Sequence, residues 1–311
     1  MRRPAATGRR LDMGPIEELG ARIAAACPPG WRETAIPRLG LMRAETRTAF
    51  APALYDPVVC FAAQGRKRIA VAGREYDYDP AQYLVVAVDL PAMARIVEAS
   101  PEAPYLAARL RLDPSILNEL ILEMPGAGDG GRSRGIGIGR MDGDLADAVL
   151  RLVRLIDQPA EAAGLAPLVE REILYRLLLG PQGAMLRQVA LEDSRLARVG
   201  RAIAWIRQNY DRPLRVAELA DLAAMSPATL HRHFRAVTAM SPLQYQKHLR
   251  LHEARRRLVV DGHAAQTVGF GVGYESPSQF SREYARLFGT PPARDGARIR
   301  GSGAEPALER G

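Results

Sequence analysis

Residues 226–234 read Ser-Pro-Ala-Thr-Leu-His-Arg-His-Phe, and residues 276–284 read Ser-Pro-Ser-Gln-Phe-Ser-Arg-Glu-Tyr. The two stretches share a Ser-Pro start, a large apolar residue, an arginine and an aromatic residue, all in the same order. They lie about 50 residues apart, and a repeat at such a period usually marks a duplicated supersecondary unit. The chain therefore carries two copies of one local structure near its C-terminus.

Each copy has the pattern of a capped amphipathic helix. A serine hydroxyl caps free backbone N–H groups, and proline at the first helical position gives up no hydrogen-bond donor. Arg232 and Arg282 lie about 200° around the helix from the apolar anchors, and so point away from the core. The anchors recur at helical spacing in both copies: Leu230, Phe234, Val237, and Phe280, Tyr284, Leu287.

A shorter segment precedes each capped helix. Residues 216–223 predict a helix that leads through a tight turn at 224–226, as in a helix-turn-helix. Residues 267–275 hold the same place in the second copy, where three glycines predict a short helix held by packing. Residues 242–258 predict one connecting helix of about 15 residues, about 22 Å long. Such a spacer suits two recognition helices in successive major grooves, about 34 Å apart.

The motifs of both units resemble the C-terminal DNA-binding domain of the AraC/XylS family of transcription regulators. The match covers roughly residues 195–296, and residues 272–292 carry the family signature. The resemblance implies that the second helix of each unit enters a major groove. By position it assigns these base-facing residues: Ala228, Thr229, His231, Arg232, Pro277, Ser278, Gln279, Ser281 and Arg282. Ala228 and Pro277 stand where longer side chains often occur, and they offer apolar contact with a thymine methyl.

Charge supports the same region independently. Residues 198–298 carry 16 Lys and Arg against 8 Asp and Glu, whereas the rest of the chain carries 27 of each sign. All the excess positive charge therefore lies where phosphate neutralisation would use it. The candidates for phosphate contact are Arg235, Arg255, Arg256, Arg257 and Arg286. Taken singly, a solvated charge explains each of them equally well.

The N-terminal part has a different pattern, of short β-like runs broken by turn signals at 64–65, 72–73 and 79–80. Such spacing suggests a small barrel or jelly roll. The stretch 35–125 resembles the cupin-like sensing domain of one AraC-type subgroup, through Tyr55-Asp56-Pro57, Gln64-Gly65-Arg66-Lys67 and Tyr83-Leu84-Val85. The expected strands are 39–43, 58–63, 67–71, 74–78, 83–88 and 107–112. The fold class is therefore α+β with several domains.

A barrel enzyme is the main alternative, because many cupins bind a metal through His and carboxylate ligands. All five histidines lie in the C-terminal part: His231, His233, His248, His252 and His263. Cys27 and Cys60 give neither a zinc site nor a disulfide framework, and Cys60 reads as a small buried apolar residue. The glycines of 126–139 follow no clear strand, which indicates a flexible loop and not a phosphate cradle. We therefore expect no catalysis, cofactor or metal.

A barrel in a regulator suggests a small effector, whose binding residues stay unassigned. Aromatic and basic residues that would shape a pocket are Phe61, Tyr76, Tyr83, Tyr105, Arg66 and Lys67. Taken singly, core packing or surface solvation explains each of them better than contact with a ligand does. A non-specific or RNA-binding module is the remaining alternative, and competition between random and selected duplexes separates it from a specific DNA binder.

Three further helices are expected at 145–156, 165–178 and 196–210, and the first two either pack on the barrel or pair across a two-fold axis. The expected domains are a disordered tail 1–14, a sensing domain 15–125, a loop with accessory helices 126–194, a DNA-binding domain 195–296 and a disordered tail 297–311. Translation begins at Met1 or Met13. The expectation is a cytoplasmic regulator of promoter DNA that binds no membrane, with a homodimer and RNA polymerase implied as partners by the resemblance.

Overall fold

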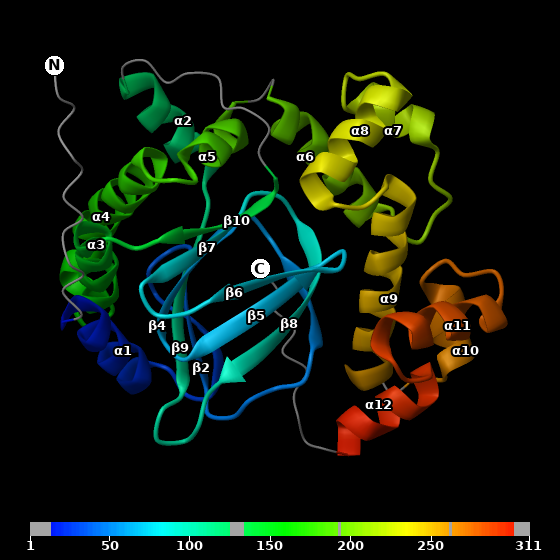
Figure 1. Cartoon of the computed structure of the whole chain (residues 1–311), viewed down its shortest axis with the longest axis horizontal. Coiled ribbons are helices and arrows are strands. Elements are labelled where there is room, and N and C mark those ends of the chain that lie inside the picture. Colours follow the sequence, from blue (N-terminus) through cyan, green and yellow to red (C-terminus); the bar gives the residue numbers. More distant parts are fainter. Residues whose placement is uncertain (1–13, 125–133, 192–193, 261–262, 302–311) are drawn as a thin grey trace, which may run out of the picture.

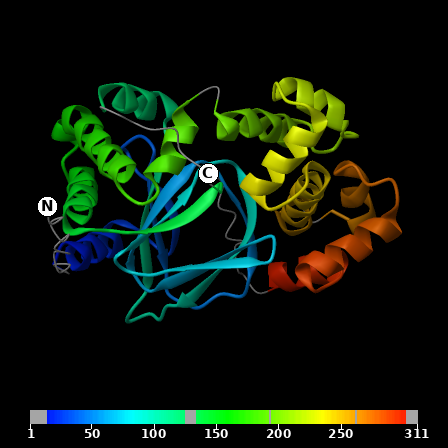
Figure 2. The same ribbon diagram turned by 45° about the horizontal axis from the view of Figure 1, so that its top comes forward.

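The protein has a β-rich part and a helical part that lie side by side in this computed structural model (Figure 1). The structure describes residues 14–124, 134–191, 194–260 and 263–301. In both ribbon views helices α6 to α12 lie on one side of the strands, and α1, α3 and α4 lie on the other (Figure 2). The β-rich part with its own helices and the helical C-terminal part confirm the expected fold class.

The β-rich part consists of two antiparallel sheets. The strands are β1 (Gly30–Glu33), β2 (Leu39–Ala44), β3 (Ala51–Tyr55), β4 (Val58–Gln64), β5 (Arg66–Val71), β6 (Arg74–Tyr78), β7 (Gln82–Val86), β8 (Leu90–Glu98), β9 (Tyr105–Arg111) and β10 (Ile136–Arg140). One sheet has the order β1-β2-β9-β4-β7-β10 and the other has the order β3-β8-β5-β6. Strand β4 is buried on both faces, which explains its unbroken apolar run, whereas β5 alternates between half-buried and buried residues.

The six strands expected from the sequence are present, and four further strands were missed. Pro52 and Pro91 break the β pattern of β3 and β8, although both residues pair within the second sheet. Strand β1 has only four residues at the edge of its sheet. The missed strands are thus the ones whose composition departs from ordinary strand propensity.

The prediction of a flexible loop over 126–139 is wrong for its last part, while 126–133 lies outside the described residues. Strand β10 pairs with β7 through five residue pairs. A Cβ atom at Gly139 would come within 2.2 Å of the Tyr83 ring, and one at Gly137 within 2.5 Å of Gln182. The glycines therefore let a strand pass close to large neighbours.

Helices cover the outer face of the six-stranded sheet. Helix α1 (Gly14–Ala26) packs on β4, β9 and helix α3 (Gly143–Arg154). Helix α3 packs in turn on α4 (Pro159–Leu179), while α2 (Pro114–Glu123) and α5 (Gly183–Ala190) pack together; the 3-10 turn η1 (Leu155–Asp157) joins α3 to α4. The expected helices 145–156 and 165–178 correspond to α3 and α4. The apolar face of α4 is only partly buried, since Leu165 and Leu168 are exposed.

The helical part contains α6 (Arg195–Gln208), α7 (Val216–Leu222), α8 (Pro227–Thr238), α9 (Pro242–Val260), α10 (Ala265–Gly271), α11 (Pro277–Phe288) and α12 (Pro292–Gly301). Connecting helix α9 has 19 residues, so it is about 28 Å long and exceeds the expected length. Helix α12 packs on α9 and α11. The expected tail 297–311 is therefore helical as far as Gly301, and 302–311 lies outside the described residues, as does 1–13.

The buried side chains form one large core and two smaller ones. The large core runs from the barrel and its helices into the first helix-turn-helix unit, as far as Tyr245 and Leu249 of α9. A separate cluster around Phe280 and Tyr284 holds the second unit. The first unit thus shares its core with the barrel, and the second has its own.

Gly273 offers a test of this packing. Its φ is +90°, and a Cβ atom there would come within 2.2 Å of the Asp211 carbonyl oxygen. Gly273→Ala should lower the free energy of unfolding by about 1–3 kcal/mol, measured by urea unfolding. Gly289→Ala is the control, since Gly289 also has a positive φ but no atom lies within 4 Å. Equal costs for the two substitutions would show that the contact with Asp211 is unimportant.

Candidate nucleic-acid interface

The two helix-turn-helix units share their backbone geometry. The Ser226 hydroxyl accepts a hydrogen bond from the Thr229 N–H, and the Ser276 hydroxyl accepts one from the Gln279 N–H, both at 3.3 Å. The turn before each capped helix has a residue with positive φ, Ala224 in the first unit and Gly273 in the second. Both expected caps are therefore present, and the duplication extends to the turns.

Each turn also closes its first helix in the same way. The Met225 N–H donates to the Ala220 carbonyl at 2.9 Å, and the Tyr274 N–H donates to the Gly269 carbonyl at 3.0 Å. This is the bond of a helix that ends in a left-handed residue. Helix α10 has only seven residues, which confirms the short helix expected from its glycines. At Gly269 a Cβ atom would lie 2.9 Å from the Phe280 ring, so this glycine permits close packing of α10 on α11.

The outer face of helix α8 is accessible. Ala228, His231 and Arg232 are exposed, while Thr229 is half-buried and its hydroxyl accepts a hydrogen bond from Ser226. Arg232 forms no ion pair with any residue that the structure describes. The first unit therefore presents the expected residues on one face, with a free guanidinium group at its centre.

Helix α11 repeats this arrangement with shorter side chains. Ser278, Gln279 and Arg282 are exposed, and Pro277 and Ser281 are half-buried. The Gln279 side chain donates to the Glu283 carboxylate at 3.2 Å. Within the described ranges Arg282, like Arg232, makes no ion pair. Helices α8 and α11 thus each carry one available arginine at the equivalent position.

The expected phosphate contacts divide into two groups. Arg235 and Arg286 are exposed near the ends of α8 and α11. Arg255 is buried and forms an ion pair with Asp295 at 2.7 Å, so its guanidinium group does not face a phosphate in this structure. Tyr284 donates to the same carboxylate at 3.0 Å. Arg255 therefore joins α9, α11 and α12.

Arg256 and Arg257 are also engaged within the protein. Both guanidinium groups bind Glu253, at 2.7 Å and 2.8 Å respectively. Arg257 donates further to the Gly271 carbonyl at the end of α10, and to the Tyr210 hydroxyl. These two arginines stabilise the second unit, and the spacing of three and four residues from Glu253 along one helix accounts for both pairs.

Arg250, which the sequence analysis did not single out, ties α9 to the loops beside it. Its guanidinium group donates to the carbonyl groups of Tyr210 at 2.6 Å, Gly273 at 2.7 Å and Arg212 at 3.0 Å. These carbonyls lie after α6 and in the turn of the second unit. One side chain therefore fixes the second unit relative to the end of α6.

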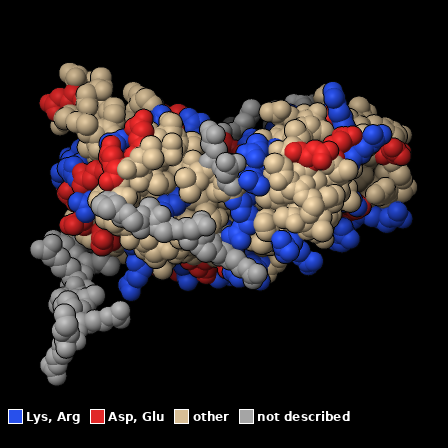
Figure 3. All heavy atoms as spheres, turned by 90° about the horizontal axis from the view of Figure 1, so that it is seen from above, with Lys and Arg blue, Asp and Glu red and all other residues tan. Residues whose placement is uncertain are grey.

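Acidic and basic side chains are distributed differently over the two parts of the protein. In Figure 3 acidic side chains gather on the side that carries α1 to α4, while basic side chains line the seam between the two parts and the rim of the helical part. On this face (Figure 3), basic side chains are therefore concentrated along the seam and on the helical part.

A cluster of charged residues joins the first unit to the barrel. The Arg207 guanidinium of α6 binds the Asp56 carboxylate at 2.9 Å and also pairs with Asp89. The Tyr245 hydroxyl of α9 donates to the Asp89 carbonyl at 2.8 Å, and the Gly135 N–H donates to the Val237 carbonyl at 3.0 Å. The end of α8 and the start of α9 therefore rest directly on the barrel.

Asp89 is the member of this cluster whose protonation changes near neutral pH. Burial and the adjacent carboxyl group of Asp56 raise the pKa of Asp89 to about 7, and the charge of Arg207 opposes the rise. Burial raises the pKa of Tyr245 far above its usual range, so its hydroxyl stays protonated. Near neutral pH the junction therefore exchanges a proton at Asp89.

The barrel residues expected to shape an effector pocket are mostly part of the core. Phe61, Tyr83 and Tyr105 are fully buried, and the Tyr105 hydroxyl donates to the Tyr78 hydroxyl at 3.0 Å. Arg66 pairs with Glu98 at 2.5 Å near the surface, and Tyr76 is half-buried on β6. Lys67 is buried inside the barrel. Among the described residues no group of three or more His, Cys, Asp or Glu is arranged to hold a metal.

Two family models match the chain in the order of its two parts. The model described as "AraC-type transcriptional regulator N-terminus" matches residues 35–185, and the one described as "Helix-turn-helix domain" matches residues 219–297. The chain belongs to the AraC-type transcriptional regulators. No helix within the described ranges of this regulator is long and apolar enough to cross a membrane.

Among curated proteins, this AraC-type chain is similar to the transcriptional activator RhaS. It is 29% identical to RhaS of Escherichia fergusonii over 156 residues, which are 49% of this chain and 55% of the relative. It is 32% identical to RhaS of Pectobacterium carotovorum over 90 residues, which are 29% of this chain and 32% of the relative. The chain thus spans about half, or less, of the length of these relatives.

Among solved structures the fold is similar to that of ToxT from Vibrio cholerae. The unsaturated fatty acid bound form has a TM-score of 0.54 at 9% identity, and covers 85% of this chain and 96% of its own. A form bound to a methylnaphthalenyl butenoic acid also has a TM-score of 0.54 at 9% identity, with 87% and 99% covered. The likeness shows that this chain and ToxT share one overall fold.

The junction at Asp89 gives a pH prediction. Its pKa is higher in the folded protein than the ordinary value of 3.8, so its contribution to stability is full below about pH 4 and is lost as the pH rises through about 7. Asp89→Asn mimics the protonated form. Between about pH 5 and pH 8 the wild type should lose about 2–3 kcal/mol of unfolding free energy relative to this variant.

Urea unfolding at several pH values measures this difference. Asp144→Asn is the control, because Asp144 is an exposed aspartate that pairs with Arg176. A wild type that follows the pH dependence of Asp89→Asn throughout this range would refute the role of Asp89.

Proposed function

We propose that the protein is a sequence-specific DNA-binding transcription regulator, whose helices α8 and α11 enter successive major grooves. One observation carries the proposal: two units with the same backbone each present an exposed arginine, Arg232 or Arg282, on the outer face. Arginine binds guanine edges through two parallel hydrogen bonds. Ala228, Thr229, His231, Pro277, Ser278, Gln279 and Ser281 accompany these two arginines at the bases. Arg235, Arg286 and the helix N-termini set the register on phosphates.

The proposal includes control by a small effector in the barrel. The two similar ToxT structures hold an unsaturated fatty acid and a butenoic acid, according to their descriptions. In this chain the barrel touches the first unit through Arg207, Tyr245 and Val237. A ligand that shifts β3 or the start of β8 would therefore act on α6 and α9. We place this regulator in the cytoplasm, with no catalytic activity of its own.

We further propose that RNA polymerase is a partner, because the curated relatives are described as activators. A second copy of the chain is the other protein partner. Helix α4 presents an exposed apolar stripe formed by Leu165, Leu168, Tyr175 and Leu179. Their spacing of three, seven and four residues is that of a coiled-coil seam. Because a two-fold interface joins one patch to itself, the stripe suits an α4–α4 dimer.

The DNA prediction concerns the two arginines. Arg232→Ala and Arg282→Ala should each weaken binding to a duplex enriched by in vitro selection, by about 1–3 kcal/mol, and relax preference at one base position. Arg74→Ala is the control, since it removes the same charge from an exposed strand of the barrel. Binding is measured at one salt concentration against selected and random duplexes. A wild type without preference between the duplexes would support a non-specific or RNA-binding module.

The dimer prediction concerns α4. Leu168→Glu should shift the protein toward the monomer in sedimentation velocity, because it places a charge in the centre of the seam. Leu122→Glu is the control, as Leu122 is exposed on α2 outside the stripe. A monomeric wild type, or the same shift for both variants, would contradict an interface at α4.

A further inference from the structure

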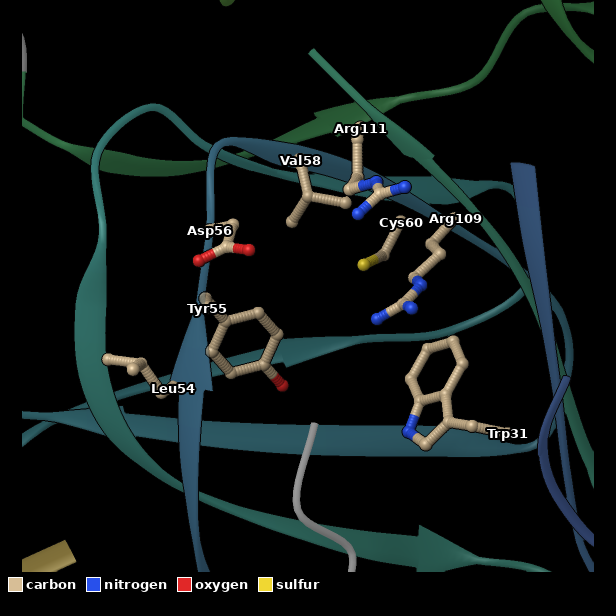
Figure 4. Close-up of a pocket in the computed structure, with 8 residues that line it drawn as sticks. All are labelled: Trp31, Leu54, Tyr55, Asp56, Val58, Cys60, Arg109 and Arg111. Atoms are coloured by element: carbon tan, nitrogen blue, oxygen red, sulfur yellow. The ribbon is translucent and has the colours of Figure 1, made fainter. Parts of the chain in front are cut away.

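One pocket opens between the two sheets of the barrel. Its lining combines basic, aromatic and apolar residues, namely Trp31, Leu54, Tyr55, Asp56, Val58, Cys60, Arg109 and Arg111. Figure 4 shows the Arg109 guanidinium and the Cys60 thiol directed toward the space beside the Tyr55 ring, with Trp31 next to Arg109. The part wide enough for a water molecule has a volume of about 10 Å³, so the pocket is nearly closed in this conformation.

Arg109 is the central group of this pocket. It lies on the inner strand β9, its side chain is 7% exposed, and its guanidinium carbon is 4.4 Å from the centre of the Trp31 ring. Gly40 is its partner across β2, and a Cβ atom there would come within 2.8 Å of the Arg109 side chain. The glycine at this register position thus leaves room for the Arg109 side chain inside the barrel.

The carboxylate of Glu33 pairs with Arg109 from the surface. Glu33 is the last residue of β1, a four-residue edge strand, and its side chain is 57% exposed. A buried charge requires a partner, because its removal from water costs much free energy. The two members of the pair differ in how firmly they are held. Arg109 is fixed inside the barrel, whereas Glu33 lies on a short strand at the barrel's rim.

Further hydrogen-bond donors surround the same space. Lys67 is 3% exposed, and its ammonium group lies 5.7 Å from the centre of the Trp31 ring and 5.6 Å from that of the Tyr55 ring. The indole N–H of Trp31 is buried and donates to no described residue. The acidic residue of the lining, Asp56, lies on the opposite side of the pocket from Arg109 in Figure 4 and binds Arg207. The interior is therefore suited to an anion with a flat or apolar body.

We propose that the barrel binds a small organic carboxylate at Arg109, in exchange for the carboxylate of Glu33. This inference rests on the proposed effector control and specifies its ligand class. The incoming carboxylate takes over the guanidinium group, the Trp31 N–H donates to it, and the apolar body lies against Trp31 and Tyr55. Release of Glu33 frees β1 to move with Trp31, which opens the nearly closed pocket.

The exchange also reaches the junction with the helical part. Tyr55 ends β3, and the next residue, Asp56, binds Arg207 of α6. A ligand body against the Tyr55 ring therefore presses on the residue that precedes this ion pair. Occupancy of the pocket and the position of α6 are linked through two adjacent residues.

Carboxylates and their neutral amides test the exchange. The chain has two tryptophans, so Trp205→Phe leaves Trp31 as the fluorescent reporter in the pocket. Benzoate and octanoate are titrated into this full-length variant, beside benzamide and octanamide. We expect saturable binding of at least one acid, roughly tenfold tighter than its amide, since a hydrogen bond to a charged group is the stronger one.

Two substitutions should act in opposite directions. Glu33→Gln removes the internal competitor and should tighten binding of the acid roughly threefold or more, whereas Arg109→Gln should weaken it at least roughly tenfold. Arg109→Lys keeps the charge and should retain more affinity than Arg109→Gln. Glu45→Gln is the matched control, because Glu45 pairs with Arg43 on the same barrel, and it should change nothing.

Several outcomes would overturn the exchange: no binding of either acid even by Glu33→Gln, equal affinity for acid and amide, or unchanged or weaker binding after Glu33→Gln. The Glu33 result keeps the test decisive if Arg109→Gln fails to fold. DNA binding is measured on the same samples. If the protein binds a specific duplex but no acid, the carboxylate exchange is refuted and the proposed regulator function stands. If the wild type binds no specific duplex, the proposed regulator function itself is refuted.

Discussion

The three carbonyl contacts of Arg250 are the constraint on which the helical part depends. Helix α9 carries the first unit at its start and the second at its end, and Arg250 near its middle binds the segments after α6 and α10. Because a guanidinium group donates in fixed directions, it holds these segments at a set angle. The second unit is thereby held in place relative to the end of α6, while the Tyr245 hydroxyl near the start of α9 donates to the barrel at Asp89.

Local sequence signals were sufficient for the duplicated units. Serine caps, proline at the first helical turn and apolar residues at helical spacing act within one or two turns, and each is present where expected. Arg255 of α9 was harder, because its partner is distant in sequence, whereas Arg256 and Arg257 pair with Glu253 on the same helix. Arg255 meets Asp295 across 40 residues, and a basic run gives no sign of such a partner. Whether an arginine stabilises the fold or is accessible to a phosphate depends on the exposure of its side chain. That exposure is set by tertiary packing.

The barrel shows the same limit. Alternating strands were predictable from their composition, whereas β3, β8 and β10 contain proline or glycine and depend on tertiary pairing. The pocket residues Trp31, Tyr55 and Arg109 come from three separate strands, and only the strand register places them together. The aromatic residues that sequence reasoning favoured, such as Phe61 and Tyr83, fill the core instead. The buried arginine opposite Gly40 carried no local pattern that distinguished it from other arginines.

The two helix-turn-helix units belong to separate hydrophobic cores, and this affects how readily each unit opens. The first unit shares its buried side chains with the barrel, while the second is held by a small cluster of its own. Local opening costs less where fewer apolar side chains are buried. Amide hydrogens of α10 and α11 are therefore expected to exchange with solvent faster than those of α8. Under the proposed DNA contacts, α8 would meet the duplex as part of the large core, and α11 as part of a smaller core that opens more readily.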